Sequence, residues 1–393
     1  MYEIIIANLS PCDMLAIMTT RGDTMNRFMS ACTMVLLAAF LGLNVAGCSQ
    51  SEPIRIGAIL ILTDQNGDRL SVETETLNGM QMAVKEINEA GGIHGTKVEL
   101  IYRDCQGRPG LAKKQFRELA ALSPAAVINI YTHITEALVP LATELKTIQL
   151  ATLATGEDIT QNAPYSFRYW PQSSDEGRAI LPLVDKLRVR KLGLVNIDNT
   201  YGNSVSDELS SLLIEKDVAT KKIVYSEIDP SLTKKLESLA DCDAIIFTCF
   251  PINMVPLATV IREKYSDKIL IGPNSISSPH YIKHPIFDGV YVAAPCIYNP
   301  ASPYLGDVGP RLEKAYGLPL SHYSAIGYDV ITLLAQIITK VGTSPEAIQE
   351  TFKTGFVFPG LFGDVVNAKE AHHMAYQLIP AIIKNQRLKY QRR

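Results

Sequence analysis

The sequence predicts an α/β protein in which helices cover both faces of mainly parallel sheets. Two observations support this prediction. Short apolar runs typical of buried strands alternate with amphipathic helical stretches along most of the 393 residues. The alternation occurs in two series that meet near residue 176, which indicates two similar α/β lobes. A chain of this length is also long enough for two domains.

The first series begins with the apolar run IRIGAILIL at 54–62, followed by a helical pattern over 77–90. Three glycines then occur within 91–95, directly before the strand pattern KVELIY. A phosphate-binding loop follows a strand and opens a helix, whereas these glycines follow a helix, so they are interpreted as its cap. The remaining predicted elements are helix 110–122, strand AAVINIY, helix 135–145 and strand TIQLAT.

The second series begins with a helix over 176–188 and alternates in the same way. No low-complexity linker separates it from the first series, and the segment YWPQSSD at 169–175 is the expected passage between the lobes. The other predicted elements are strand KLGLVNI, helix 203–216, strand KKIVYSE, helix 231–239, strand DAIIFTC, helix 253–265, strand KILIG and strand GVYVAAP.

Composition excludes several classes of function. The net charge is −3, the pI is near 6.2, and no stripe of lysine and arginine with interleaved aromatics occurs, so no nucleic-acid partner is expected. The sequence contains no P-loop, no GxSxG motif and no HExxH motif. No cysteine or histidine spacing is typical of a zinc site, so no metal is expected.

The N-terminal part predicts export. A short positive region at 25–27 precedes an apolar stretch over 31–48 that ends in VAGC. Its apolar part of roughly 15 residues is shorter than the roughly 20 that a membrane-spanning helix needs. VAGC resembles a bacterial lipobox, which implies a signal peptide over 1–48 and a lipid anchor on Cys48. Residues 1–24 contain Asp13, Arg21 and Asp23 and do not suit the start of a signal peptide, so translation is expected to begin at Met25. The alternative is a plain signal peptide, cut nearby, with that cysteine unmodified.

The cysteines allow one disulfide in an oxidising compartment. Cys242 and Cys249 bracket a single strand, and the length of that strand places them too far apart to be bridged. Cys249 and Cys296 both end strands that could be neighbours, so they are the possible pair, and Cys105 would be free.

Several stretches together resemble a known family. They are IRIGAIL, LNGMQMAVKEINEAGGIHGTKVELIYRD, SFRYWPQSSDEG, NTYGNS, GVYVAAPCIYNP and HYSAIGYDVITLLAQII, spread between Ile54 and Leu378. Their order and spacing resemble the type I periplasmic solute-binding proteins of the Leu/Ile/Val-binding group. The resemblance implies two Rossmann-like lobes with parallel sheets, joined by three crossover strands. It implies no enzymatic activity and no cofactor, and it names an ABC transporter permease as the partner.

The resemblance also fixes expected boundaries. One lobe is expected to comprise 53–169 plus 298–357, and the other 171–296 plus 360–393. The three crossings are expected near Tyr169–Pro171, Pro295–Tyr298 and Val357–Gly360. A ligand is expected in the cleft at the carboxyl edges of both sheets, where open α/β sheets bind ligands.

Seven ligand-binding residues are implied by position in the family pattern: Thr132, His133, Leu153, Thr155, Tyr201, Phe250 and Asn253. The threonine hydroxyls and a backbone carbonyl of Leu153 would hold the ligand from the first lobe, and Tyr201 would cover it from the second. Each has a plainer alternative. Thr132 and Thr155 could cap following helices, and Tyr201 could be a surface aromatic in a turn.

The chain departs from the family pattern at two places. Val72 and Glu73 stand where the family usually has an aromatic residue and a glycine. The run FPIN at 250–253 lacks the acid that faces the ligand ammonium in amino-acid binders. A buried ammonium without a counter-charge costs several kcal/mol. Either Glu73 or another acid therefore replaces it, or the ligand is not an α-amino acid.

We therefore expect a lipid-anchored, extracytoplasmic solute-binding protein for an amino acid or a related amide or carboxylate. One alternative is a sensor that presents bound solute to a membrane receptor. A remote alternative is a serine β-lactamase-like enzyme, because SLTK at 231–234, SDK at 266–268 and KTG at 353–355 occur in that order. The predicted secondary structure around these three patterns does not suit such an enzyme.

Overall fold

The computed structural model describes residues 52–298 and 304–391. Within these ranges one sheet has eight strands in the order β11-β12-β13-β5-β4-β3-β1-β2. From β13 to β2 all neighbouring strands are parallel, while β12 pairs antiparallel with both β11 and β13. The bounds are β1 Ile54–Leu60, β2 Val98–Asp104, β3 Ala126–Ile130, β4 Gln149–Thr152, β5 Ser166–Tyr169, β11 Phe356–Gly360, β12 Gly363–Asn367 and β13 His373–Ala375.

The described part of the chain forms a second sheet of seven strands, in the order β15-β14-β10-β9-β8-β6-β7. Its strands are parallel from β7 to β10, and β14 and β15 add antiparallel at the other edge. The predicted fold class is therefore confirmed. The bounds are β6 Lys191–Ile197, β7 Ala219–Tyr225, β8 Ala244–Thr248, β9 Ile269–Gly272, β10 Tyr291–Pro295, β14 Leu378–Lys384 and β15 Arg387–Tyr390.

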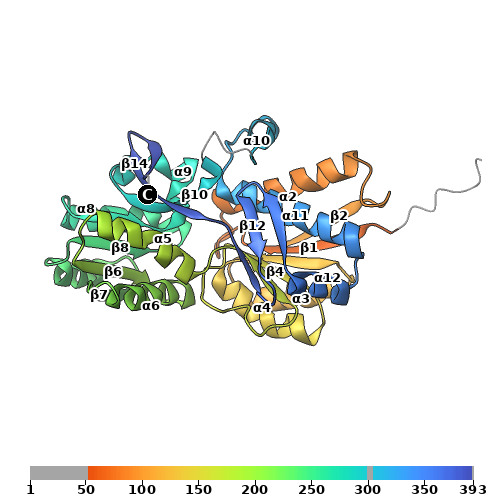
Figure 1. Cartoon of the computed structure of the whole chain (residues 1–393), viewed down its shortest axis with the longest axis horizontal. Helices are drawn as coiled ribbons and strands as arrows, with labels where there is room; N and C mark the ends of the chain where they lie inside the picture. Colours follow the sequence, from red (N-terminus) through yellow and green to blue (C-terminus); the bar gives the residue numbers. More distant parts are fainter. Residues whose placement is uncertain (1–51, 299–303, 392–393) are drawn as a thin grey trace, which may run out of the picture. The chain divides into compact units, whose positions relative to one another are not determined.

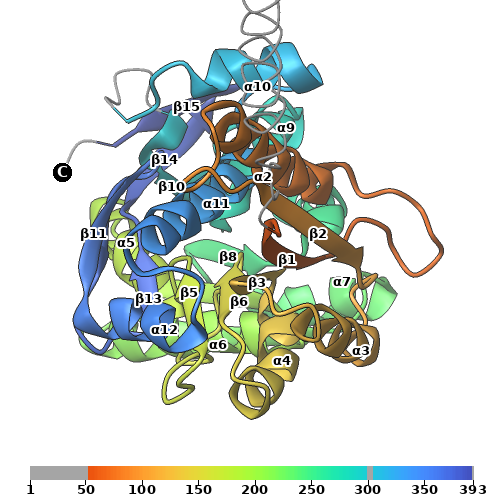
Figure 2. The same cartoon turned by 90° about the vertical axis from the view of Figure 1, so that its right-hand side faces the viewer.

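Helices cover both sheets. Figure 2 shows α2 and α11 on one face of the first sheet and α3 and α4 on the other, and Figure 1 shows α5, α6 and α8 around the second sheet. Their bounds are α2 Ser71–Glu89, α3 Pro109–Ala120, α4 Thr132–Glu144, α5 Ser173–Lys186, α6 Thr200–Ile214, α7 Pro230–Leu236, α8 Met254–Lys264, α9 Pro279–Ile282, α10 Val308–Tyr316, α11 His322–Val341 and α12 Pro345–Thr354.

The glycine-rich stretch after α2 is a helix terminus, as predicted. Gly91 and Gly92 have φ angles of 103° and 78°, which a residue without a Cβ adopts without strain. The Gly92 N–H donates to the carbonyl of Ile87 at 2.9 Å, and the Gly91 N–H donates to that of Asn88 at 3.2 Å. These bonds satisfy carbonyls at the helix end and turn the chain toward β2.

Helices α2 and α11 pack with their backbones in close approach, and both views show them side by side (Figures 1 and 2). A Cβ on Gly79 would lie 1.9 Å from the carbonyl oxygen of Ser324, and one on Gly327 would lie 2.0 Å from that of Thr76. Helix α11 is also long and apolar enough to cross a membrane. It is nevertheless a core helix of this lobe, since 61% of its apolar window is buried.

One predicted crossing between the lobes is wrong. The chain was expected to cross near Val357–Gly360, but it turns back there as the hairpin β11–β12 and stays in the first sheet through β13. It enters the second sheet between Ala375 and Leu378 (Figure 1). Gly363, with φ of 100°, opens β12 directly after the two-residue turn that closes this hairpin. Residues 361–375 thus add two strands to the first sheet and none to the second.

The possible disulfide is absent from the structure, since the four cysteines of the described ranges are all free thiols. Cys296 donates from its Sγ to the carbonyl of Phe362 at 3.0 Å. Cys249 is buried at the end of β8, where burial raises the pKa of its thiol well above the usual range. These two cysteines end strands separated by β9, which explains why they do not meet.

Candidate functional site

A cavity lies where the carboxyl ends of strands from both sheets meet, and we call it the inner cavity. The space between its atoms amounts to about 550 Å³, part of it open to solvent. Only about 50 Å³ of it admits the centre of a water-sized sphere, so the cavity is narrow. It is lined by Tyr131, Thr132, His133, Leu153, Thr155, Trp170, Glu176, Asn199, Thr200, Tyr201, Cys249, Phe250, Pro251, Asn274, Ser275, His322 and Tyr323.

The structure brings six of the seven predicted ligand-binding residues together in this wall. Asn253 is the exception. It ends a short 3-10 turn, Pro251–Asn253, that precedes α8, and it is not among the residues that line the cavity. Contact of the other six with a ligand stays a prediction.

Two threonine hydroxyls define the first lobe's side of the inner cavity. The Oγ1 of Thr132 accepts from the Gly156 N–H at 3.1 Å, and the Oγ1 of Thr155 accepts from the Nε1 of Trp170 at 3.0 Å. Neither hydroxyl caps a helix, because α4 begins without a side-chain cap and Thr155 lies in the loop after β4. A hydroxyl that accepts one bond still has a proton to donate, so both can donate to a ligand.

Trp170 is a lining residue that the sequence analysis did not place in the site. Besides its bond to Thr155, its ring meets the Tyr376 ring edge-on, with centroids 5.5 Å apart. Burial of Trp170 makes the single bond of its indole N–H structurally important, because a buried donor without an acceptor is unfavourable.

Replacing Thr155 with valine is therefore expected to have two effects. It should leave the indole N–H of Trp170 without its acceptor and lower the free energy of unfolding by about 1–3 kcal/mol. It should also weaken ligand binding. Thr155→Ser, which keeps the hydroxyl, is the matched control and should retain most of both properties. Urea denaturation and calorimetric titration measure them, and wild-type stability in Thr155→Val would contradict the role given to this bond.

The second lobe's side of the inner cavity contains an acid that the sequence analysis did not single out. Glu176 of α5 is buried, and the Nδ2 of Asn274 donates to its Oε1. Among the described residues none donates a hydrogen bond to its second oxygen in the structure. Burial raises the pKa of Glu176 from 4.5 to about 8. This carboxyl group is therefore available to a donor on a ligand.

Three helices begin at the inner cavity, which supplies positive potential without a cationic side chain. Thr132, Thr200 and His322 are the first residues of α4, α6 and α11, and all three line the cavity. Helix N-termini favour anions through their N–H groups and their dipoles. Burial lowers the pKa of His322 to about 3, so this ring is neutral at physiological pH. The arrangement suits an acidic group on one side and a hydrogen-bond donor near Glu176.

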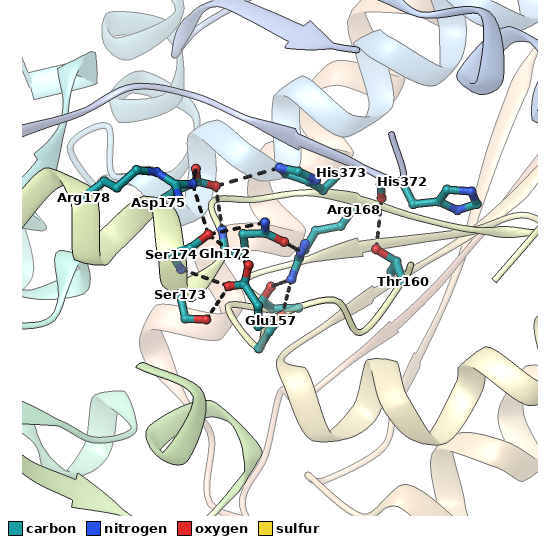
Figure 3. Close-up of polar contacts among 12 residues, drawn as sticks. Glu157, Thr160, Arg168, Gln172, Ser173, Ser174, Asp175, Arg178, His372 and His373 are labelled. Carbon is teal, nitrogen blue, oxygen red and sulfur yellow. Dashed lines mark hydrogen bonds and ion pairs between the residues drawn. The ribbon is translucent and has the colours of Figure 1, made fainter. Parts of the chain in front are cut away.

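A polar network fixes the first crossing beside the cavity (Figure 3). Arg168 of β5 is buried and donates to the carbonyl oxygens of Ala154 and Gly156 and to the side chain of Gln172. Glu157 accepts from the N–H and hydroxyl of Ser174, both at 2.9 Å. These bonds tie the loop that carries Thr155 to the start of α5, the helix that carries Glu176.

The three β-lactamase-like patterns do not form a site. Ser231 lies in the first turn of α7 and donates to the carboxylate of Asp229 at 2.6 Å. Ser266 follows α8, and Lys353 belongs to α12, which packs against α11. None of the three lines the inner cavity.

Two mainly parallel sheets with a cavity at the carboxyl ends of their strands are the arrangement of a bilobal binding protein. The chain belongs to the periplasmic binding protein family, because the sequence pattern of that family matches residues 53–386. It is thus a solute-binding protein and not an enzyme. The family prediction is confirmed; its lipoprotein form concerns residues outside the described ranges.

Its relatives include a Leu/Ile/Val-binding protein homolog 3 of Brucella melitensis, 23% identical over 63% of this chain and 67% of that protein. The substrate-binding protein BasB of a chemotactic signal transduction system in Halobacterium salinarum is 23% identical over 72% of this chain and 69% of its own length.

Two solved structures show the same fold. LivJ of Streptococcus pneumoniae, in complex with isoleucine, has a TM-score of 0.74 and 20% identity, covering 86% of this chain and 99% of its own. A solute-binding protein of Rhodopseudomonas palustris, in complex with benzoate, has a TM-score of 0.75 and 16% identity, covering 86% and 95%.

Proposed function

We propose that this protein captures a small polar organic ligand, an amino acid or a related amide or carboxylate, and delivers it to an ABC transporter permease. The observation that carries the proposal is the inner cavity. Its first-lobe side offers the hydroxyl of Thr132 at the start of α4 and the hydroxyl of Thr155 in the loop after β4, and its second-lobe side offers the buried carboxyl of Glu176. An amino acid has both kinds of group, an acid and a hydrogen-bond donor.

Glu176 supplies the acid that the sequence pattern lacked at 250–253. If the ligand has an ammonium group, that group stabilises the ionised carboxylate and offsets the cost of burying it. A ligand without an ammonium, such as the benzoate bound by the Rhodopseudomonas protein, meets a protonated carboxyl that donates or accepts a hydrogen bond. In both cases Glu176 is the group that distinguishes the two classes of ligand.

Entry requires movement of the lobes, since the inner cavity is narrow and both lobes line it. In the proposed cycle the ligand first meets Thr132 and Thr155, and the second lobe then closes with Tyr201 and Phe250. Closure is a shift of population toward the form in which the ligand makes all its contacts. The closed form presents the surface that the permease recognises.

Anchoring is proposed from the sequence alone. Export with cleavage before Cys48, followed by lipidation of that cysteine, would hold the protein at the outer face of the cytoplasmic membrane. Mass spectrometry of the mature protein from its own cells tests this proposal. A diacylglycerol-modified N-terminal cysteine is expected, and a mature N-terminus without lipid would contradict it.

A second candidate is ligand sensing, which the similarity to the chemotactic protein BasB favours. Both candidates use the same inner cavity and differ in the partner. Deleting the gene separates them: loss of uptake of the ligand indicates delivery to a permease. Normal uptake with a lost chemotactic response indicates sensing.

A thermal-shift screen of the chain from Ser49 onward tests the ligand class. A ligand that binds only the native state at 100 times its Kd adds about 2.7 kcal/mol of stability and so raises Tm. The set contains leucine, isoleucine, phenylalanine, lysine, benzoate and simple amides. A rise with at least one of them is expected, and no rise with any would contradict the proposed function.

A further inference from the structure

A second cavity adjoins the inner one, and we call it the outer cavity. It encloses about 1830 Å³ of empty space, part of it open to solvent, against about 550 Å³ for the inner cavity. The two cavities share five lining residues: Tyr131, His133, Asn199, Phe250 and Pro251. The outer cavity therefore begins where the inner one ends.

Three aromatic rings from both lobes stand at this boundary. Tyr131 and His133 follow β3 in the first lobe and stack with centroids 6.5 Å apart. Phe250 follows β8 in the second lobe and meets both rings edge-on, at 5.9 Å and 5.8 Å. This ring trio stands between the two cavities, and it includes rings from both lobes.

Tyr131 is held in a strained backbone conformation. Its φ of 66° and ψ of 149° lie in a region that only glycine usually occupies. Such strain costs about 1–3 kcal/mol, persists only where the surroundings enforce it, and gathers at ligand clamps. The hydroxyl of this tyrosine donates to the Oε1 of Glu73 at 2.9 Å, which fixes the ring at the boundary.

Glu73 lines the outer cavity from the first turn of α2, and its side chain is more than nine-tenths buried. Its Oε1 accepts from Tyr131, but its Oε2 is buried and has no hydrogen-bond partner within the described ranges. Burial raises the pKa of this carboxyl. A buried polar atom without a partner is costly, and a donor brought by a ligand would remove that cost.

The ionisable lining of the outer cavity has an excess of acids. Its lining contains three acids, Asp64, Glu73 and Asp198, against one arginine, Arg69, and also two histidines, His133 and His280. The inner cavity has no lysine or arginine in its lining and takes its positive potential from helix N-termini. The inner cavity thus suits an acid at the helix N-termini together with a donor at Glu176, whereas the outer cavity suits a cationic or hydrogen-bond-donating group.

We propose that the outer cavity is a second ligand compartment, in which Glu73 binds a distal amine or hydroxyl of an elongated acid. The acidic end of the ligand lies in the inner cavity, and its middle passes the ring trio of Tyr131, His133 and Phe250. The inference rests on the proposed function, since it places the acidic end in the same inner cavity. It extends the ligand from a small acid to one with a second polar end.

Probe pairs that differ only in the distal donor test this inference. Suitable pairs are L-lysine with L-norleucine, L-tyrosine with L-phenylalanine, and 4-hydroxybenzoate with benzoate. Calorimetric titration of the wild-type chain should give at least tenfold tighter binding of the donor-bearing member in at least one pair. In Glu73→Gln, which keeps an acceptor for Tyr131, that preference should fall below threefold.

Thr155→Val is the control variant in the inner cavity. It should weaken the binding of both members of a pair by the same factor. Equal binding of both members of every pair by the wild type would overturn the second compartment and leave the proposed function standing. The comparison of paired probes uses the wild type alone. It therefore tests the second compartment even if Glu73→Gln fails to fold. A preference unchanged in Glu73→Gln would overturn the role of Glu73. Absence of binding by every probe would overturn the proposed function together with this inference.

Discussion

Gly79→Ala is expected to lower the free energy of unfolding by at least about 3 kcal/mol. Alanine is the better helix former, by roughly 0.5–1 kcal/mol, so propensity alone predicts the opposite sign. The clash decides, because the new Cβ would lie 1.9 Å from the Ser324 carbonyl oxygen and 2.9 Å from the Tyr328 nitrogen. Both atoms belong to the backbone of α11, so the two helices must separate.

Gly110→Ala is the matched control. This glycine lies near the start of α3, and a Cβ there would meet nothing within 4 Å. Chemical denaturation should show Gly110→Ala as stable as the wild type or slightly more stable. A Gly79→Ala variant that matches it would show that α2 and α11 are not held in close contact. The contact matters for the site, because the first turns of α2 and α11 line the outer and inner cavities.

Glu176→Gln is expected to remove much of the pH dependence of stability of the ligand-free protein. Burial raises the pKa of Glu176 in the folded state to about 8, from its ordinary value of 4.5. Folding therefore favours the protonated form of this carboxyl. The contribution of that form to the free energy of unfolding is fully present below pH 4.5. That contribution is lost as the pH rises toward 8, because the unfolded chain ionises freely.

Integrated over this interval, the wild type should lose about 2–4 kcal/mol to this group. Glutamine keeps an acceptor for Asn274 and cannot ionise, so the variant should gain stability relative to the wild type as the pH rises from 4.5 to 8. Part of the slope should remain, because burial raises the pKa of Asp329 to about 7 as well.

Urea denaturation at pH 4.5, 6 and 8 measures the difference. Glu144→Gln, at an exposed glutamate that ends α4, is the matched control and should follow the wild type at every pH. A constant difference between Glu176→Gln and the wild type across these pH values would show that the cavity does not hold this carboxyl protonated. Ligands with an ammonium group should lose affinity in Glu176→Gln more than ligands without one.

The alternation of apolar runs predicted the fold because short apolar runs are typical of buried strands. β3 and β8 are buried along their whole length, and such strands occur where helices cover both faces of a sheet. The cap at Gly91 and Gly92 was predictable for a similar reason, since its positive φ angles need glycine. Both features depend on residue types within a short stretch of the chain, so they can be predicted from a single sequence.

The starts of the helices were predicted too late, and the site lies there. Helices predicted at 135–145, 176–188 and 203–216 begin at Thr132, Ser173 and Thr200 instead. Their first turns are polar and carry no apolar period, because they face the cavity or the first crossing and not the core. Glu176 was missed for the same reason, since it lies in the polar first turn of α5.

The third crossing could not be located from local patterns. The run from Phe356 to Asn367 has the apolar character of two strands, but which sheet they join depends on pairing with β13 and β5. The contacts of the ring trio could not be predicted from the sequence either, because Phe250 lies more than one hundred residues from Tyr131 and His133. Only the packing of one lobe against the other brings these rings together.

We propose that the ligand binds in the inner cavity. Calorimetric titration of the ligand found in the screen, with the wild type and with Thr132→Val and Thr155→Val, tests it most directly. One ligand per chain is expected, with a Kd about tenfold weaker in each variant, as the loss of one hydrogen bond implies. Binding that is equally tight in the wild type and both variants would contradict ligand binding in the inner cavity.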